Sequence, residues 1–208
     1  MTGATIRAAV NARLGKTEIA DAFNASITLA LQAIGGMAKW PDLHKTDPDS
    51  DSPATLAFTS GDKSKALPAD FRIPDRLYRA DDSTLSMMHP DMLRAYQEVA
   101  NAGTGEPVSY AIIGGSVYLY PIPDASYTIY LDYWYEPATI SDETLDLVLG
   151  NEFQEAVICG TIVAYLKATG FTVHPKLAEN ETAFDREIAK LMPLEDFKLI
   201  IAKPYRYA

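Results

Sequence analysis

The sequence predicts an α+β fold: a mainly α-helical bundle with an inserted antiparallel β-rich subdomain and an extended C-terminal tail. Apolar residues recur every three or four positions up to residue 35 and again after residue 150, which is typical of helices. Between residues 109 and 135 they follow a period of two, which is typical of strands. We therefore expect the bundle to comprise residues 1–53 and 141–202, the insertion 54–140, and the tail 203–208.

Two helices are predicted in the first third of the chain. The first covers residues 5–14, because its apolar residues are four positions apart and Gly15 can close it. The second is capped by Thr17 and ended by Gly35 and Gly36, and its apolar stripe consists of Ile19, Phe23, Ile27 and Leu31. A loop rich in proline and aspartate follows.

The middle of the chain is predicted to be mainly extended. Residues 54–59 form a strand, and residues 66–78 an extended segment that prolines interrupt. Two tyrosine-rich strand regions follow residue 108: a hairpin of 109–113 with 117–120 across a Gly-Gly turn, and a long strand over 127–135. Between the two groups lies a helix over 89–102, which begins with Pro90 and has on one side Met92, Leu93, Tyr96 and Val99.

Helices return in the last third. Ser141, followed by two acids, is expected to open a helical turn. Longer helices are expected over residues 151–168, closed by Gly170, and over residues 175–192.

No arrangement of residues predicts an enzyme, a metal site or a cofactor site. The three histidines are far apart in sequence and are expected at the surface or in caps, and Cys159 lies in the apolar register of a helix. The acidic loop at 47–51 lacks the glycine and the glutamate of a calcium loop. The pairs Asp81/Asp82 and Glu152/Glu155 leave open a small carboxylate-based hydrolase, which would need two close acids with mismatched pKa values in one pocket.

Charge and hydropathy argue against two classes of partner. The formal net charge of -10, with scattered basic residues, disfavours proteins that grip nucleic acid. The sequence shows no signal peptide and no apolar run long enough for a membrane span. We therefore expect neither specific DNA binding nor a membrane partner.

Aromatic residues indicate protein–protein contacts instead, since the chain has 12 tyrosines. In the strand 127–135 the odd-numbered residues share one face, and the even-numbered face includes Tyr130 and Trp134. One face must pack on the core, and the second is expected either to do the same or to be covered by a neighbouring subunit. The tail is either a frayed terminus or an interface segment, whose candidate contact residues are Lys203, Tyr205, Arg206 and Tyr207.

Three stretches resemble a known family. They are residues 39–43 (KWPDL) after a helix ending in Gly-Gly, residues 67–71 (LPADF), and residues 106–141 (EPVSYAIIGGSVYLYPIPDASYTIYLDYWYEPATIS). Together they resemble the head-to-tail adaptors of short-tailed bacteriophages, also called connectors or tail tubular proteins A. The acidic loop 47–53 and the particular C-terminal tail fall outside the family pattern.

The resemblance implies a structural virion protein and no catalytic residues. It implies a ring of twelve copies in the neck of the particle, between the portal ring and the tail nozzle or tail tube protein, assembled in the host bacterial cytoplasm. Genomic DNA would pass through the lumen during packaging and ejection without specific binding. A different phage assembly protein or a tail-completion factor is the alternative.

Overall fold

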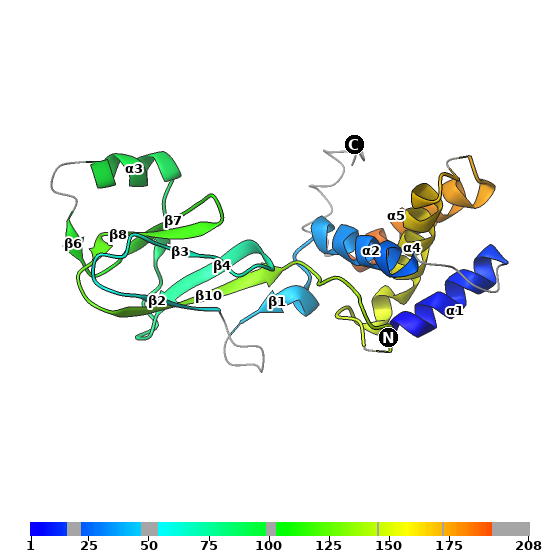
Figure 1. Cartoon of the computed structure of the whole chain (residues 1–208), viewed down its shortest axis with the longest axis horizontal. Coiled ribbons are helices and arrows are strands. Elements are labelled where there is room, and N and C mark those ends of the chain that lie inside the picture. Colours follow the sequence, from blue (N-terminus) through cyan, green and yellow to red (C-terminus); the bar gives the residue numbers. More distant parts are fainter. Residues whose placement is uncertain (16–21, 47–53, 99–102, 145, 172, 193–208) are drawn as a thin grey trace. The chain divides into compact units, whose positions relative to one another are not determined.

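The computed structural model describes residues 1–15, 22–46, 54–98, 103–144, 146–171 and 173–192, and confirms an α+β fold (Figure 1). The chain forms two compact units. Residues 1–43 together with 136–208 make the helical unit, and residues 44–135 make the β-rich unit. The sequence-based domain boundaries at 53/54 and 140/141 stay a prediction, and the tail 203–208 lies outside the described residues.

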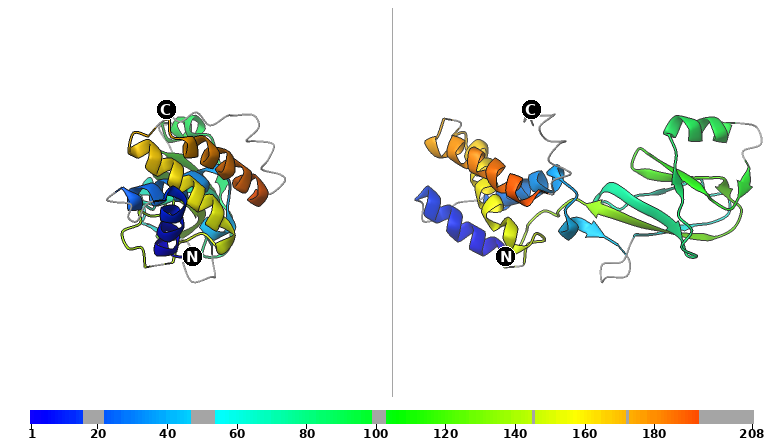
Figure 2. Two further views of the ribbon diagram at one scale, coloured as in Figure 1. Left: turned by 90° about the vertical axis from the view of Figure 1, so that its right-hand side faces the viewer. Right: turned by 180° about the vertical axis from the view of Figure 1, so that it is seen from behind.

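The helical unit is built around one central helix, α4 (Gln154–Ala168), which packs against α1 (Gly3–Leu14), α2 (Phe23–Met37) and α5 (Pro175–Leu191) (Figures 1 and 2). Two short 3-10 helices, η1 (Pro41–Leu43) and η2 (Asn151–Phe153), complete the unit. Most of α4 is buried, because its sequence is apolar almost all round. A Cβ on Gly160 would lie 2.9 Å from Phe184 and 3.1 Å from Ala30, so α4 meets α5 and α2 at this glycine.

The described residues of the segment 141–150 are not helical, contrary to prediction. Asp142 accepts hydrogen bonds from the backbone and hydroxyl of Thr144, so this aspartate closes a turn. The backbone of the segment pairs with the start of α1, where Ala4 donates to the Glu143 carbonyl and Leu147 to the Met1 carbonyl. These long-range hydrogen bonds replace the helical ones that the sequence suggested.

Gly35 and Gly36 do not end the second helix, which is a further correction. The helix α2 continues to Met37, and the indole of Trp40 donates to the Ile34 carbonyl near its end. A Cβ on Gly35 would lie 3.1 Å from both Leu43 and Pro137, so this glycine allows close packing. The predicted cap Thr17 lies outside the described residues, whereas Gly15 ends α1 in the left-handed conformation as expected.

The β-rich unit has two four-stranded sheets. In the first, β10 (Tyr127–Tyr135) pairs antiparallel with β4 (Phe71–Arg79) along one edge. Along its other edge β10 pairs with β2 (Ala54–Phe58) and β1 (His44–Lys45). The second sheet has the order β3 (Ser64–Ala66), β8 (Ser116–Tyr120), β7 (Ser109–Ile113) and β5 (Ser86–Met87), and α3 (Pro90–Glu98) packs on β7. A small parallel pair joins β6 (Thr104–Gly105) to β9 (Ile122–Pro123).

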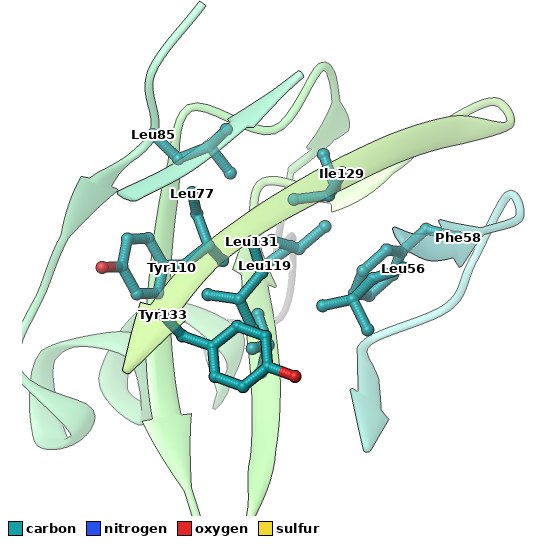
Figure 3. Packing of buried hydrophobic residues seen from close by; sticks show 10 residues of the cluster. Leu56, Phe58, Leu77, Leu85, Tyr110, Leu119, Ile129, Leu131 and Tyr133 are labelled. Carbon is teal, nitrogen blue, oxygen red and sulfur yellow. The ribbon is translucent and has the colours of Figure 1, made fainter. Parts of the chain in front are cut away.

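The core of this unit lies between the two sheets. Side chains from β2, β4 and β10 meet side chains from β7 and β8 (Figure 3). The predicted hairpin is confirmed, with Gly114 and Gly115 at positive φ between β7 and β8. The cluster of buried residues comprises Leu56, Phe58, Leu77, Leu85, Tyr110, Val117, Leu119, Ile129, Leu131 and Tyr133.

Candidate interface surfaces

The strand β10 has two different faces, as its alternation predicts. Ile129, Leu131 and Tyr133 belong to the core cluster, and Tyr127 and Tyr135 pack against it. The even-numbered residues point to the opposite side of the sheet because successive side chains alternate along a strand. We call that side the β10 face, and it comprises Tyr130, Asp132 and Trp134 with their cross-strand neighbours Thr55, Arg76, Tyr78 and His44.

Tyr130 and Trp134 are half-buried, and each stacks on a ring of its own chain. The Tyr130 ring lies 5.4 Å from that of Tyr78 at 27°, and the Trp134 ring lies 4.3 Å from that of His44 at 17°. These intramolecular stacks fix the orientation of both aromatic groups and leave part of each exposed. A subunit contact at Tyr130 and Trp134 stays a prediction, now with a preorganised surface.

A buried carboxylate organises the centre of the β10 face. Asp132, with its side chain 4% exposed, lies 3.3 Å from Nε of Arg76 and accepts a long hydrogen bond of 3.5 Å from the Tyr78 hydroxyl. The Arg76 guanidinium also lies 4.0 Å above the Tyr78 ring. Desolvation alone would lower the pKa of Arg76, but the Asp132 charge outweighs it and the pKa is raised. The side chain therefore remains a cation.

Sequence reasoning missed Arg76, Tyr78 and His44 as parts of this surface. The available signal was Asp132 itself, because an acid flanked by strand residues needs a donor or cation on a neighbouring strand. Which strand supplies that partner depends on the pairing of β4 with β10, and the sequence alone does not give the register.

A second aromatic surface lies over the other sheet. Among the described residues on the predicted apolar side of helix 89–102, Leu93 is buried, whereas Met92 and Tyr96 are 52% and 43% exposed. Val99 lies outside the described residues. The Tyr96 ring stacks on Tyr120 of β8 at 5.0 Å and 24°. We call this surface the α3 face, and it comprises Asp91, Met92, Tyr96, Tyr118 and Tyr120.

Two of the three histidines cap turns, as predicted. The Nδ1 atom of His89 accepts from the Asp91 backbone, and Nδ1 of His174 accepts from Lys176 at the start of α5. Within the described residues no cluster of three His, Cys, Asp or Glu side chains is arranged to hold a metal ion. The rings of His89 and His174 thus serve as acceptors for local backbone N–H groups.

Cys159 lies in the interior of the helical unit. Burial, and then the nearby charge of Glu155, raise the pKa of its thiol, which disfavours the nucleophilic thiolate. A pocket of about 350 Å³ lies beside it, lined among others by Arg13, Glu155, Glu179 and Arg186. The Arg13 guanidinium donates to both oxygens of Glu155, so this carboxylate is held in an ion pair with Arg13.

One acid of each predicted pair, Asp81 and Glu155, has a basic partner of its own. Asp81 lies 3.1 Å from Arg79, and the Ser83 backbone N–H lowers the pKa of this aspartate. Glu155 binds Arg13, while Glu152 is exposed at the surface. The pocket beside Cys159 is lined by Glu155 and not by Glu152, so this pair does not share that pocket.

The remaining candidates lie outside the described residues. These are the acidic loop 47–53 and the tail residues Lys203, Tyr205, Arg206 and Tyr207. Among the helices that the structure describes, none combines the length and the apolar character of a membrane span.

Comparison with known proteins identifies the chain. The family model of the SU10 adaptor protein matches residues 1–198, which is almost the whole chain. No curated protein gives a significant match. A phage adaptor is a structural component of the virion, in agreement with the two aromatic surfaces. The chain belongs to the SU10 adaptor protein family of bacteriophage adaptors.

Proposed function

We propose that this adaptor forms a ring between the portal and the tail of a short-tailed phage and serves as a head-to-tail connector. The observation that carries the proposal is the preorganised β10 face on a chain of the adaptor family. Adhesive surfaces that are rigid before assembly favour ring formation, since fixed side chains lose less entropy on binding. No catalytic step is part of this role.

Twelve copies would make the ring, with Tyr130 and Trp134 at a contact between subunits. Tyrosine and tryptophan supply much of the binding energy of protein interfaces because they are large and amphipathic. The tail nozzle or tail tube protein would dock on the side of the ring away from the portal.

The C-terminal tail would supply the contact with the portal. Lys203, Tyr205, Arg206 and Tyr207 combine residue types that are enriched in interfaces, and Pro204 prevents helix formation there. Deletion of residues 203–208 should weaken attachment to purified portal rings, measured by co-sedimentation, and leave the far-ultraviolet circular dichroism and the melting temperature unchanged. Unchanged attachment would contradict the assignment.

The lumen of the ring would conduct genomic DNA without holding it. The net charge of -10 would repel phosphates if the acidic residues gather on the lumen wall. Such a ring would be assembled on the portal in the host cytoplasm and would remain in the neck of the virion.

The test is electron microscopy of the purified protein mixed with the portal ring of its phage. A second ring stacked on the portal, with the predicted twelvefold symmetry, would support the proposal and locate the contacts. Absence of any bound ring, with both proteins folded, would overturn it.

A further inference from the structure

The β-rich unit has a second adhesive surface besides the β10 face. We infer that neighbouring copies associate head to tail, with the β10 face of one copy against the α3 face of the next. This inference rests on the proposed ring and specifies which surfaces close it.

The two faces lie on opposite sides of one compact unit. Tyr130, Asp132 and Trp134 point away from the core because they alternate with Ile129, Leu131 and Tyr133. In the other sheet Tyr118 and Tyr120 alternate with the core residues Val117 and Leu119, and Tyr96 of α3 stacks on Tyr120. Figure 1 shows α3 on the side of β7 and β8 that faces away from β4 and β10. The core thus separates the two faces.

Opposite, non-identical faces are what a closed ring of identical subunits requires. In such a ring every subunit uses one surface toward its left neighbour and a different one toward its right neighbour. A twofold dimer would instead need one self-complementary surface. Because one chain carries both surfaces, the second copy is the occupant that uses both.

The composition of both faces fits the centre of a protein interface. Such centres are enriched in tyrosine, tryptophan, methionine and arginine. The β10 face offers Tyr130, Trp134 and Arg76, and the α3 face offers Met92 and Tyr96. On both faces stacking holds the tyrosine rings, so their ordering precedes association.

The exposed charges of the two faces are complementary. The Arg76 side chain is 43% exposed, and its carboxylate partner Asp132 lies beneath it. On the α3 face the Asp91 side chain is 77% exposed in the first turn of α3, and lies 3.9 Å from Arg94 and 3.5 Å from His89. Because Asp132 is buried, the β10 face presents a guanidinium outward, whereas the α3 face presents a carboxylate that its own neighbours approach only loosely. A guanidinium facing this carboxylate favours contact between unlike faces over contact between like faces.

The inference can be tested by cross-linking single copies at chosen faces. In a Cys159→Ala background, Thr55→Cys labels the β10 face, since Thr55 is exposed and lies directly opposite Tyr130. Met92→Cys labels the α3 face. Each protein is treated with a short bismaleimide, with and without portal rings, and its products are separated on a denaturing gel. Ala8→Cys, exposed on α1 of the helical unit, is the matched control.

A head-to-tail contact gives a distinct pattern. The chain with both cysteines should form a ladder of multimers, and an equal mixture of the two single-cysteine chains should form dimers only. Each single-cysteine chain alone, and mixtures in which Ala8→Cys replaces either partner, should remain monomeric.

Other patterns would overturn the inference. Dimers of Met92→Cys alone or of Thr55→Cys alone would indicate contact between like faces, and cross-links to the portal would assign that face to the portal. If microscopy shows a ring on the portal but no ladder forms, the face pairing is wrong while the proposed function stands. Without a ring in microscopy, the proposed function itself fails.

Discussion

The two units distribute their apolar residues differently, although each exposes some of them. In the helical unit the exposed ones are Leu29, Val148, Phe171 and Val173. In the helical unit α4 is buried among three other helices, and its side chains contribute to stability. In the β-rich unit a small core lies between two sheets whose outer faces expose or half-expose tyrosine, tryptophan and methionine. The helical unit thus carries a large buried core, and the β-rich unit carries the two aromatic faces that we propose as contacts. Substitutions in the two units should therefore separate stability from assembly.

The largest effect on stability is expected at the centre of the helical unit. Ile162 on α4 is fully buried, so Ile162→Ala should lower the free energy of unfolding by about 2–5 kcal/mol in denaturant titrations. The control is Leu29→Ala on the exposed side of α2, which should change it by about 0.5 kcal/mol or less. An equal loss of unfolding free energy in Ile162→Ala and Leu29→Ala would contradict the central place of α4.

A smaller effect is expected on the β10 face. Removing one partner of a fully buried ion pair costs about 3–5 kcal/mol. Arg76 is partly exposed, so Arg76→Ala should cost about 1–3 kcal/mol by leaving Asp132 without its cation. Adding Asp132→Asn should recover part of that loss, as measured by the same titrations in a double-mutant cycle. An additive result would show that the two residues do not interact.

The α3 face should separate assembly from stability. Tyr96→Ala removes a partly exposed ring stacked on Tyr120, and should cost about 1 kcal/mol or less of unfolding free energy. The same change should abolish the ring on the portal in electron micrographs. Ala8→Ser on α1 is the control and should leave ring formation intact. Rings formed by the Tyr96 variant would remove the α3 face from the contact.

The smallest effects concern pH, with opposite signs in the two units. Burial disfavours the charge of Asp70, but Lys45 and Tyr133 outweigh it and lower the pKa below the ordinary value of 3.8. The ionised carboxylate then stabilises the fold above that pH, and its contribution is lost as the pH falls. Asp70→Asn should thus lower the melting temperature at pH 7 and progressively less below pH 3.8.

Asp185 on α5 should behave in the opposite way. Asp185 is exposed on α5, yet partial desolvation, followed by the charge of Glu181, raises its pKa above the ordinary value of 3.8. The folded state therefore favours the protonated carboxyl of Asp185. The contribution of this group to the free energy of unfolding declines as the pH rises from below 3.8 through the raised pKa. Asp185→Asn should raise the melting temperature at pH 7 and leave it unchanged well below pH 3.8. A decrease at pH 7 would refute the assigned shift.

Local pattern predicted much of both units. The hairpin of β7 and β8, the two faces of β10 and the helices α4 and α5 follow from short-range periodicity and turn residues. Such signals are contained within a few adjacent positions, so one sequence is enough to read them.

Long-range contacts account for what the sequence did not reveal. Gly35 reads as a helix end, yet packing against Leu43 and Pro137 is what requires a glycine there. The segment after Ser141 carries helix-opening residues, but its backbone pairs with α1. On the β10 face, the alternation of side chains along the strand was enough to predict Tyr130 and Trp134 as neighbours on one side of the sheet. Their stacking partners Tyr78 and His44 depend on strand pairing across distant parts of the chain.

The interrupted course of the helical unit has a consequence during translation. Its first two helices leave the ribosome long before α4, against which they pack, whereas the β-rich unit is one continuous segment, residues 44–135. Domains generally fold as units during synthesis, so the β-rich unit can complete its fold while α2, which has no charged residue, still awaits its partner. The apolar residues of α2 therefore wait for α4 while the whole β-rich unit is synthesised.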